Sequence, residues 1–172
     1  MMWLIRAGRN STYYDVILES QRVFLPWDGY HYDFKSLKTK EELRLAVGNE
    51  KCTDNRTSVS TWVGQIIDFV HKMQIDDYVL IPSKGSHTYT LATITGDYEY
   101  DSDQSECLQH SRTIKVLIKG FPREVLPQQI QYSLGAFRTV FRVKYEDELL
   151  RSIEKWQHIS EQMKTNPDVF VE

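Results

Sequence analysis

Apolar and polar residues follow two different spacings along the chain, which predict strands and helices in mixed order. The apolar run Trp3 to Ala7 is typical of a buried first strand, and RVFLPW (22–27) predicts a second strand that Pro26 breaks. YVLIPS and TYTLATITG flank the turn SKGSH and predict a hairpin. Two further strands are expected in RTIKVLIKG, where Arg112, Ile114 and Val116 share one face, and in SLGAFRTVFRV.

Helical spacing fills the intervals between these strands. VSTWVGQIIDFVHKM (59–73) places Trp62, Ile66 and Phe69 on one stripe and predicts an amphipathic helix. Other helices are expected over 11–20, over 36–48 with Gly48 at the end, from Gln128, and over 145–165. Five or six short strands with helices between them predict an α+β fold, a small mixed β-barrel decorated with helices.

The totals describe one ordinary globular domain. The chain has 172 residues, 41% of them hydrophobic and 26% charged, with no apolar run long enough to span a membrane. We expect a domain over 1–143, followed by a C-terminal helix and a tail or linker over 144–172. The start does not resemble a signal peptide, and the two cysteines are expected to be reduced, so we expect a cytoplasmic protein.

No catalytic motif stands out in the sequence. There is no GxSxG turn, no glycine-rich phosphate loop and no histidine–glutamate pair at metal-ligand spacing. The carboxylates Asp76, Asp77, Asp97, Asp101 and Asp103 fall in turns, where Asp commonly caps backbone amides. We therefore expect a binding domain that is not an enzyme and needs no metal or cofactor. Any nuclease activity would belong to another domain or a partner.

The aromatic residues suggest a binding slot instead. They follow strand ends or begin a helix, and strand ends of a small barrel meet at one rim, where rings can stack a base. The candidates for base binding are Trp27, Tyr30, Tyr32, Trp62, Tyr98 and Tyr100, with Asp33 and Ser83 as polar contacts to the base edge. The alternative is that Trp27, Trp62 and the two tyrosines of GDYEY only pack in the core.

The net charge of −3 argues against binding nucleic acid by bulk electrostatics, but the basic residues are unevenly spread. Residues 112–144 hold seven Lys or Arg residues and one acid, Glu124. The candidates for phosphate contacts are Arg6, Arg112, Lys115 and Arg138. The alternative is a solvated outer strand face.

Several segments together resemble a known family. MWLIRAG, VFLPW, WVGQIIDFVHKMQIDDYVLIPS, TLATITGDYEY and SLGAFRTVFRV occur in the order found in the N-terminal domain of Mrr-type modification-dependent restriction endonucleases. That domain is similar to the PUA-like barrels, which include EVE, ASCH and YTH domains. The resemblance covers residues 1 to about 143. It departs at Asp76, where the family usually has glycine.

The resemblance implies recognition of a modified base, flipped into an aromatic cage to which Trp27 would contribute. We therefore expect a DNA-binding module that senses a modified base in a restriction or phage-defence system, with a nuclease or ATPase domain or subunit as a further partner. Two alternatives remain open at this stage. One is an RNA reader of a modified base, and the other is an interaction domain that binds a nucleotide or peptide.

Overall fold

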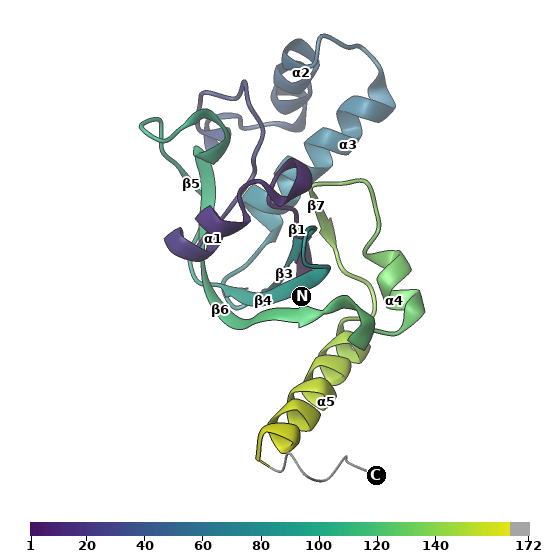
Figure 1. Ribbon diagram of the computed structural model, residues 1–172. Coiled ribbons are helices and arrows are strands. Elements are labelled where there is room, and N and C mark those ends of the chain that lie inside the picture. The colour runs from purple at the N-terminus through teal and green to yellow at the C-terminus, as the bar shows by residue number, and fades with distance from the viewer. Residues whose placement is uncertain (166–172) are drawn as a thin grey trace.

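The computed structural model describes residues 1–165 and contains seven strands and five α-helices (Figure 1). The strands are β1 (Met2–Ile5), β2 (Arg22–Phe24), β3 (Tyr78–Ser83), β4 (Thr88–Ile94), β5 (Glu99–Tyr100), β6 (His110–Pro122) and β7 (Val140–Arg142). The helices are α1 (Tyr14–Ser20), α2 (Lys40–Glu50), α3 (Arg56–Ile67), α4 (Gln128–Ser133) and α5 (Glu146–Thr165).

The strands form one curled, mixed sheet in the order β2-β6-β4-β3-β1-β7, with β5 paired to β6. β1 runs parallel to β3 and antiparallel to β7. The long strand β6 pairs with β2 and β5 along its first part and with β4 along its second part, where two register shifts bend the pair. The result is a half-barrel, and the predicted α+β fold with a small mixed barrel decorated by helices is confirmed.

Apolar side chains cover both faces of this sheet, so the core has two layers. On β1, Trp3 and Ile5 pack with α2, α3 and the segment 25–37 on one face. Met2 and Leu4 pack with α4 and α5 on the other face. Figure 1 shows α2 and α3 at one end of the molecule and α5 at the opposite end.

Local signals in the sequence explain where the helices begin. Thr39 and Glu42 form a capping box at the start of α2, and the Asn55 side chain accepts from the amide of Ser58 at the start of α3. The prediction that Gly48 ends its helix is wrong, because α2 continues to Glu50. The helix with Trp62 is confirmed and continues as a π-helical turn, Asp68–Lys72.

The C-terminal helix is partly built into the domain. It begins at Glu146, close to its predicted start, and Leu149 and Ile153 are buried against the second core layer. The expectation of a frayed tail or linker falls on residues 166–172, which lie outside the described residues.

The turn before β3 contains Asp76, which stands where the family that the sequence resembles usually has glycine. This residue has a φ of 74°, in the left-handed region that glycine adopts most easily and Asp tolerates. Its neighbour Asp77 accepts hydrogen bonds from the Trp3 indole (2.9 Å) and the Gln74 amide (3.0 Å). The expectation that Asp77 works as a turn residue is confirmed.

Candidate nucleic-acid interface

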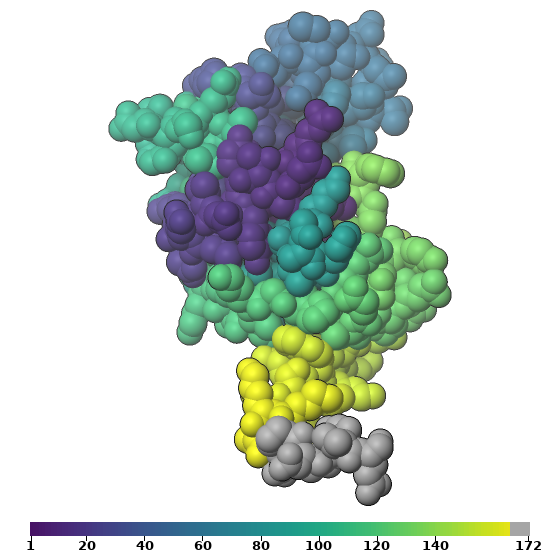
Figure 2. Space-filling view, in the orientation of Figure 1, coloured from purple at the N-terminus to yellow at the C-terminus, as the bar shows by residue number. Residues whose placement is uncertain are grey.

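A groove of about 700 Å³ opens between the segment after β1 and the β3–β4 hairpin. We call it the basic groove, because Arg and Lys line it together with His87 and no Asp or Glu does. Figure 2 shows the N-terminal segment in purple beside the hairpin in teal, with the green segment that follows β6 next to both. The lining side chains that carry the argument are Arg6, Arg9, Ser83, Lys84, Arg123 and Phe137.

The rim of the basic groove has an unusual backbone. Asn10, Ser11 and His87 have φ values of 56°, 59° and 51°, in the left-handed region that non-glycine residues seldom occupy. The Ser11 hydroxyl accepts from the Lys84 amide (2.9 Å), and the Lys84 ammonium donates to Asn10 (2.9 Å). The two walls are therefore tied together, and backbone strain of this kind is frequent at ligand sites.

Arg6 positions one wall of this groove. Its guanidinium donates to the carbonyls of Leu134 (3.1 Å), Ala136 (2.8 Å) and Arg138 (3.0 Å). Burial lowers the pKa of Arg6. These bonds hold residues 134–138 in place, and they leave the adjacent Phe137 ring fully exposed at the groove.

The phosphate candidates do not share a surface. Arg112 is buried, 1% exposed, and its guanidinium donates to the carbonyl of Phe69 (2.9 Å) and that of Gly96 (3.3 Å). The prediction that Arg112 contacts phosphate is therefore wrong, because its donors already serve the protein interior. Lys115 is exposed on β6 outside the basic groove, and Arg138 lines a separate hollow beside α3.

Three of the predicted aromatic residues do come together. Trp27, Tyr30 and Trp62 surround the ammonium of Lys51, whose Nζ lies 5.9, 6.0 and 5.1 Å from the three ring centroids. We call this arrangement the cage. Trp27 and Trp62 are partly exposed, whereas Tyr30 is buried and its hydroxyl has no hydrogen-bond partner among the described residues. The cation that these three rings face is therefore one of the protein's own side chains.

The tyrosines of GDYEY belong to a second cluster, which we call the sealed stack: Phe34, Tyr98, Tyr100 and His110. Tyr98 is 4% exposed, and its hydroxyl donates to His110 Nδ1 (2.6 Å) and accepts from the Phe34 amide (3.2 Å). His110 Nε2 donates to the Tyr30 carbonyl (2.7 Å), so in the neutral ring the proton is on Nε2 and Nδ1 accepts from Tyr98. Burial lowers the pKa of His110. The prediction that Tyr98 lines an open slot is wrong, because Tyr98 is packed and hydrogen-bonded inside the domain.

Tyr100, at the edge of the sealed stack, and the remaining candidates differ in their surroundings. Tyr100 is partly exposed beside Arg22, and its ring stacks on His110 at a centroid distance of 5.0 Å. The Tyr32 ring meets Tyr30 and Phe34 edge-on. The Asp33 carboxylate caps its own turn by accepting from the Lys35 amide (2.8 Å), and of the two polar candidates Ser83 alone lies in the basic groove.

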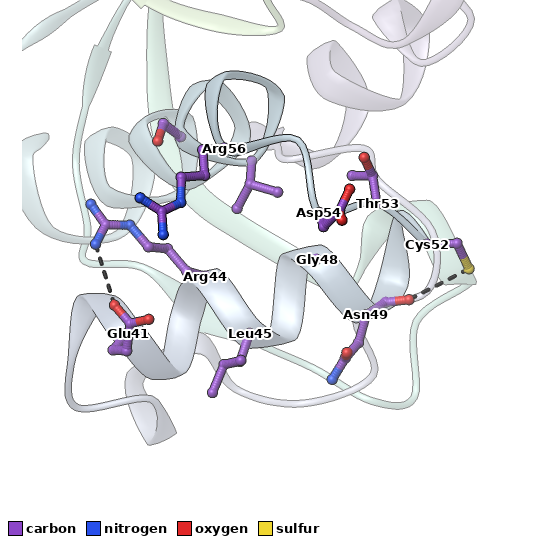
Figure 3. Close-up of a pocket in the computed structure, with 11 residues that line it drawn as sticks. Glu41, Arg44, Leu45, Gly48, Asn49, Cys52, Thr53, Asp54 and Arg56 are labelled. Carbon is purple, nitrogen blue, oxygen red and sulfur yellow. Dashed lines mark hydrogen bonds and ion pairs between the residues drawn. The ribbon is translucent and has the colours of Figure 1, made fainter.

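A second cavity lies between α2 and α3, and Figure 3 shows side chains of both charges around it. Glu41 pairs with Arg44 at 3.3 Å, so part of its charge is already neutralised. Its lining also includes Cys52, Thr53 and Asp54 from the connection between the two helices. Because both positive and negative side chains line this cavity, neither sign of charge predominates to select a ligand.

Sequence reasoning missed Lys51 and most of the basic groove. Arg9, Lys84 and Arg123 come from three separate segments, and no local pattern brings them together. Each of the segments AGRNS and SKGSH combines one glycine with polar residues, which is a signal for a turn. Nothing in either segment indicates that the two turns share a groove.

Two further observations concern metals and membranes. Within residues 1–165, no group of three or more His, Cys, Asp or Glu side chains is arranged to hold a metal ion. None of the helices in this part of the chain has the length and apolar character needed to cross a bilayer.

The fold and these sites define an α+β half-barrel domain with an aromatic cluster and a basic groove. A family model described as a domain of unknown function (DUF8426) matches residues 3–144. The chain therefore belongs to the DUF8426 family. No curated protein matches the sequence.

Proposed function

We propose that this protein is a nucleic-acid-binding module, with the sugar-phosphate backbone in the basic groove. The observation that carries the proposal is the charge of this groove: Arg and Lys side chains from three segments line it without a single carboxylate, in a chain of net charge −3. Arg and Lys are the side chains that most often contact phosphate, and their donors bind it without reading sequence.

The exposed ring of Phe137 supports nucleic acid over a free inorganic anion. A fully exposed phenylalanine beside a basic groove offers a stacking surface for a base, while the cations next to it hold the backbone. Residues 134–138, which carry this ring, are fixed by Arg6, so the surface is preorganised.

The resemblance to the N-terminal domain of Mrr-type endonucleases supports the finer part of the proposal. According to this finer proposal, the module senses a modified base in DNA for a restriction or phage-defence system in the cytoplasm. It has no nuclease activity of its own and would serve a nuclease or ATPase partner. A half-barrel with an aromatic cluster is compatible with a PUA-like domain.

The test is a titration of labelled DNA and RNA oligonucleotides at several salt concentrations. We expect the same effect from each of three variants, Arg9→Ala, Lys84→Ala and Arg123→Ala. Binding should weaken roughly 3- to 10-fold for every sequence, and the slope of log affinity against log salt concentration should fall in magnitude by about one. The matched controls are Lys115→Ala and Lys119→Ala, which remove exposed lysines of β6 outside the groove and should leave affinity unchanged.

Two results would decide against this proposal. Equal losses in the groove and control variants would mean that the groove is not the interface. Absence of binding to DNA and RNA at low salt would favour the alternative, an interaction domain for a nucleotide or peptide. Binding to RNA in preference to the matched DNA would select the RNA reader.

A further inference from the structure

The cage lies at the open seam of the half-barrel. The strand order ends at β2 on one side and β7 on the other. Trp27 follows β2, and its indole Nε1 donates to the Thr139 hydroxyl (3.1 Å) just before β7. Trp62 approaches from α3. The rings therefore stand where the sheet leaves a gap.

The charged group at the cage is the ammonium of Lys51. The Lys51 ammonium lies within cation–π range of three rings and forms no ion pair with any carboxylate in the described chain. A lysine on a protein surface normally keeps its charged end in water. Its position here shows that the three ring faces attract a positive group.

The surroundings of the cage also favour positive charge. Burial raises the pKa of Tyr30, and Glu50 and Asp28 raise it further, because their carboxylates bring negative charge close to the phenol. The Glu50 carboxylate packs so tightly against the Gly29 backbone that a Cβ there would overlap it. A cation in the cage therefore meets the faces of the rings and the field of two acids.

Lys51 is placed to leave the cage without unfolding the domain. It caps the C-terminus of α2 and is partly exposed. The next residue, Cys52, has a φ of 48°, a strained value for a non-glycine residue. Cys52 and its neighbours border the open cavity between α2 and α3 shown in Figure 3. The connection that follows Lys51 therefore contains a strained residue and borders an open cavity, which gives it room to move.

We propose that the cage is the binding site for a positively charged, N-methylated base, and that Lys51 holds the site as a resident cation until such a base displaces it. The inference rests on the proposed function and names its ligand class. Bases such as 1-methyladenine and 3-methylcytosine carry a positive charge on a flat ring, so they combine stacking on Trp27 and Trp62 with the attraction that now holds Lys51.

The same methylation makes the base easy to extrude. It blocks the Watson–Crick edge, and an unpaired base costs the least to flip out of a duplex. The route from backbone to cage is short: Phe137 stands at the basic groove, and Thr139, two residues later, holds Trp27. Two residues of extended chain span about 7 Å at most, so the two sites are close along this segment.

The experiment compares bases that carry the same methyl group at different positions and therefore differ in charge at neutral pH. DNA oligonucleotides with one 1-methyladenine or one N6-methyladenine are titrated against the full-length protein, as are the 3-methylcytosine and 5-methylcytosine pair. The cationic isomer should bind roughly 2- to 30-fold more tightly than its neutral partner. The nucleoside 1-methyladenosine, which has no phosphate, is titrated in parallel by tryptophan fluorescence.

Variants of the cage locate the effect. Trp27→Leu and Trp62→Leu should remove the preference for the cationic isomer, whereas Lys51→Ala should increase it, because no resident cation competes. The matched control is Lys35→Ala, since the Lys35 ammonium lies 5.8 Å from the single ring of Tyr98, outside the cage. Thermal melts of each variant verify that the domain is folded.

Each outcome separates this inference from the proposed function. Equal binding of both isomers, with losses in the groove variants, would overturn the cationic ligand and leave the proposed function intact. A preference for N6-methyladenine would overturn it equally. Binding of 1-methyladenosine that requires Trp27 and Trp62, without binding of any oligonucleotide, would support the cage while the proposed function fails.

Discussion

The cage and the sealed stack are built from the same kinds of residue, yet they differ in what completes them. In the cage, Trp27, Tyr30 and Trp62 surround a charged side chain on a partly exposed connection. In the sealed stack, the Tyr98 hydroxyl and both nitrogens of His110 are satisfied inside the protein. Aromatic residues near a strand end therefore show where rings gather, whereas their polar partners decide between packing and binding.

The largest expected effect separates the two clusters through stability. Tyr98→Ala should lower the free energy of unfolding by about 3–5 kcal/mol, because it leaves a cavity in the core and removes a buried hydroxyl. Denaturant unfolding measures this. Tyr132→Ala, at a tyrosine 71% exposed, is the control and should change stability by less than about 0.5 kcal/mol. Unchanged stability with a selective loss of base binding would make Tyr98 part of a slot after all.

The second largest effect on stability is expected at Arg112, a charged residue buried in the domain. Arg112→Met should cost about 2–4 kcal/mol of stability, because the carbonyls of Phe69 and Gly96 lose their donor inside the protein. Lys115→Met, three residues along the same strand and exposed, should have little effect. Loss of oligonucleotide affinity in Arg112→Met at full stability would contradict this account.

The sealed stack should also make stability depend on pH. Burial holds the pKa of His110 below its ordinary value of about 6.5, so below that pH the unfolded chain takes up a proton that the folded chain refuses. The stabilisation is complete above about pH 6.5 and is lost on acidification, at up to about 1.4 kcal/mol per pH unit. A His110→Gln variant should lose this slope, and His158→Gln, at an exposed histidine of α5, should keep it.

The smallest effect concerns the two lysines that lie over rings. Lys51→Gln should reduce stability by about 1 kcal/mol, because it removes a cation from three rings at a partly exposed site. Lys35→Gln removes a cation from one ring and should cost less than about 0.5 kcal/mol. Equal melting temperatures for the two variants would mean that the cage gives Lys51 no special stabilisation.

Local periodicity was sufficient for most of the fold. The stripe through Trp62 and the hairpin around SKGSH depend on neighbours in sequence, and both are present. The inward position of Arg112 was also visible, since it alternates in phase with Ile114 and Val116. Its charge suggested an outer face instead, because an arginine is seldom fully buried unless backbone carbonyls from distant segments receive its donors.

The sites depended on information that a single sequence does not contain. Lys51 lies in the polar connection NEKCTDNRTS, where nothing distinguishes it from a solvated lysine. The basic groove joins residues more than 100 positions apart, such as Arg9 and Arg123. Turn residues could be expected at Gly8, Asn10 and Ser11, but their meeting with the hairpin is a property of the sheet order.

The position of β1 has a consequence for synthesis on the ribosome. Trp3 pairs with Arg142, so β1 acquires its second neighbour only after a further 139 positions have been made. At about 5–20 residues per second, this takes roughly 7–30 seconds of translation. During that interval the strand has an exposed hydrogen-bonding edge and a large apolar surface, both features that promote association between chains. In a nascent chain, β1 therefore remains a point of association with other chains until the sequence SLGAFRTVFRV has emerged.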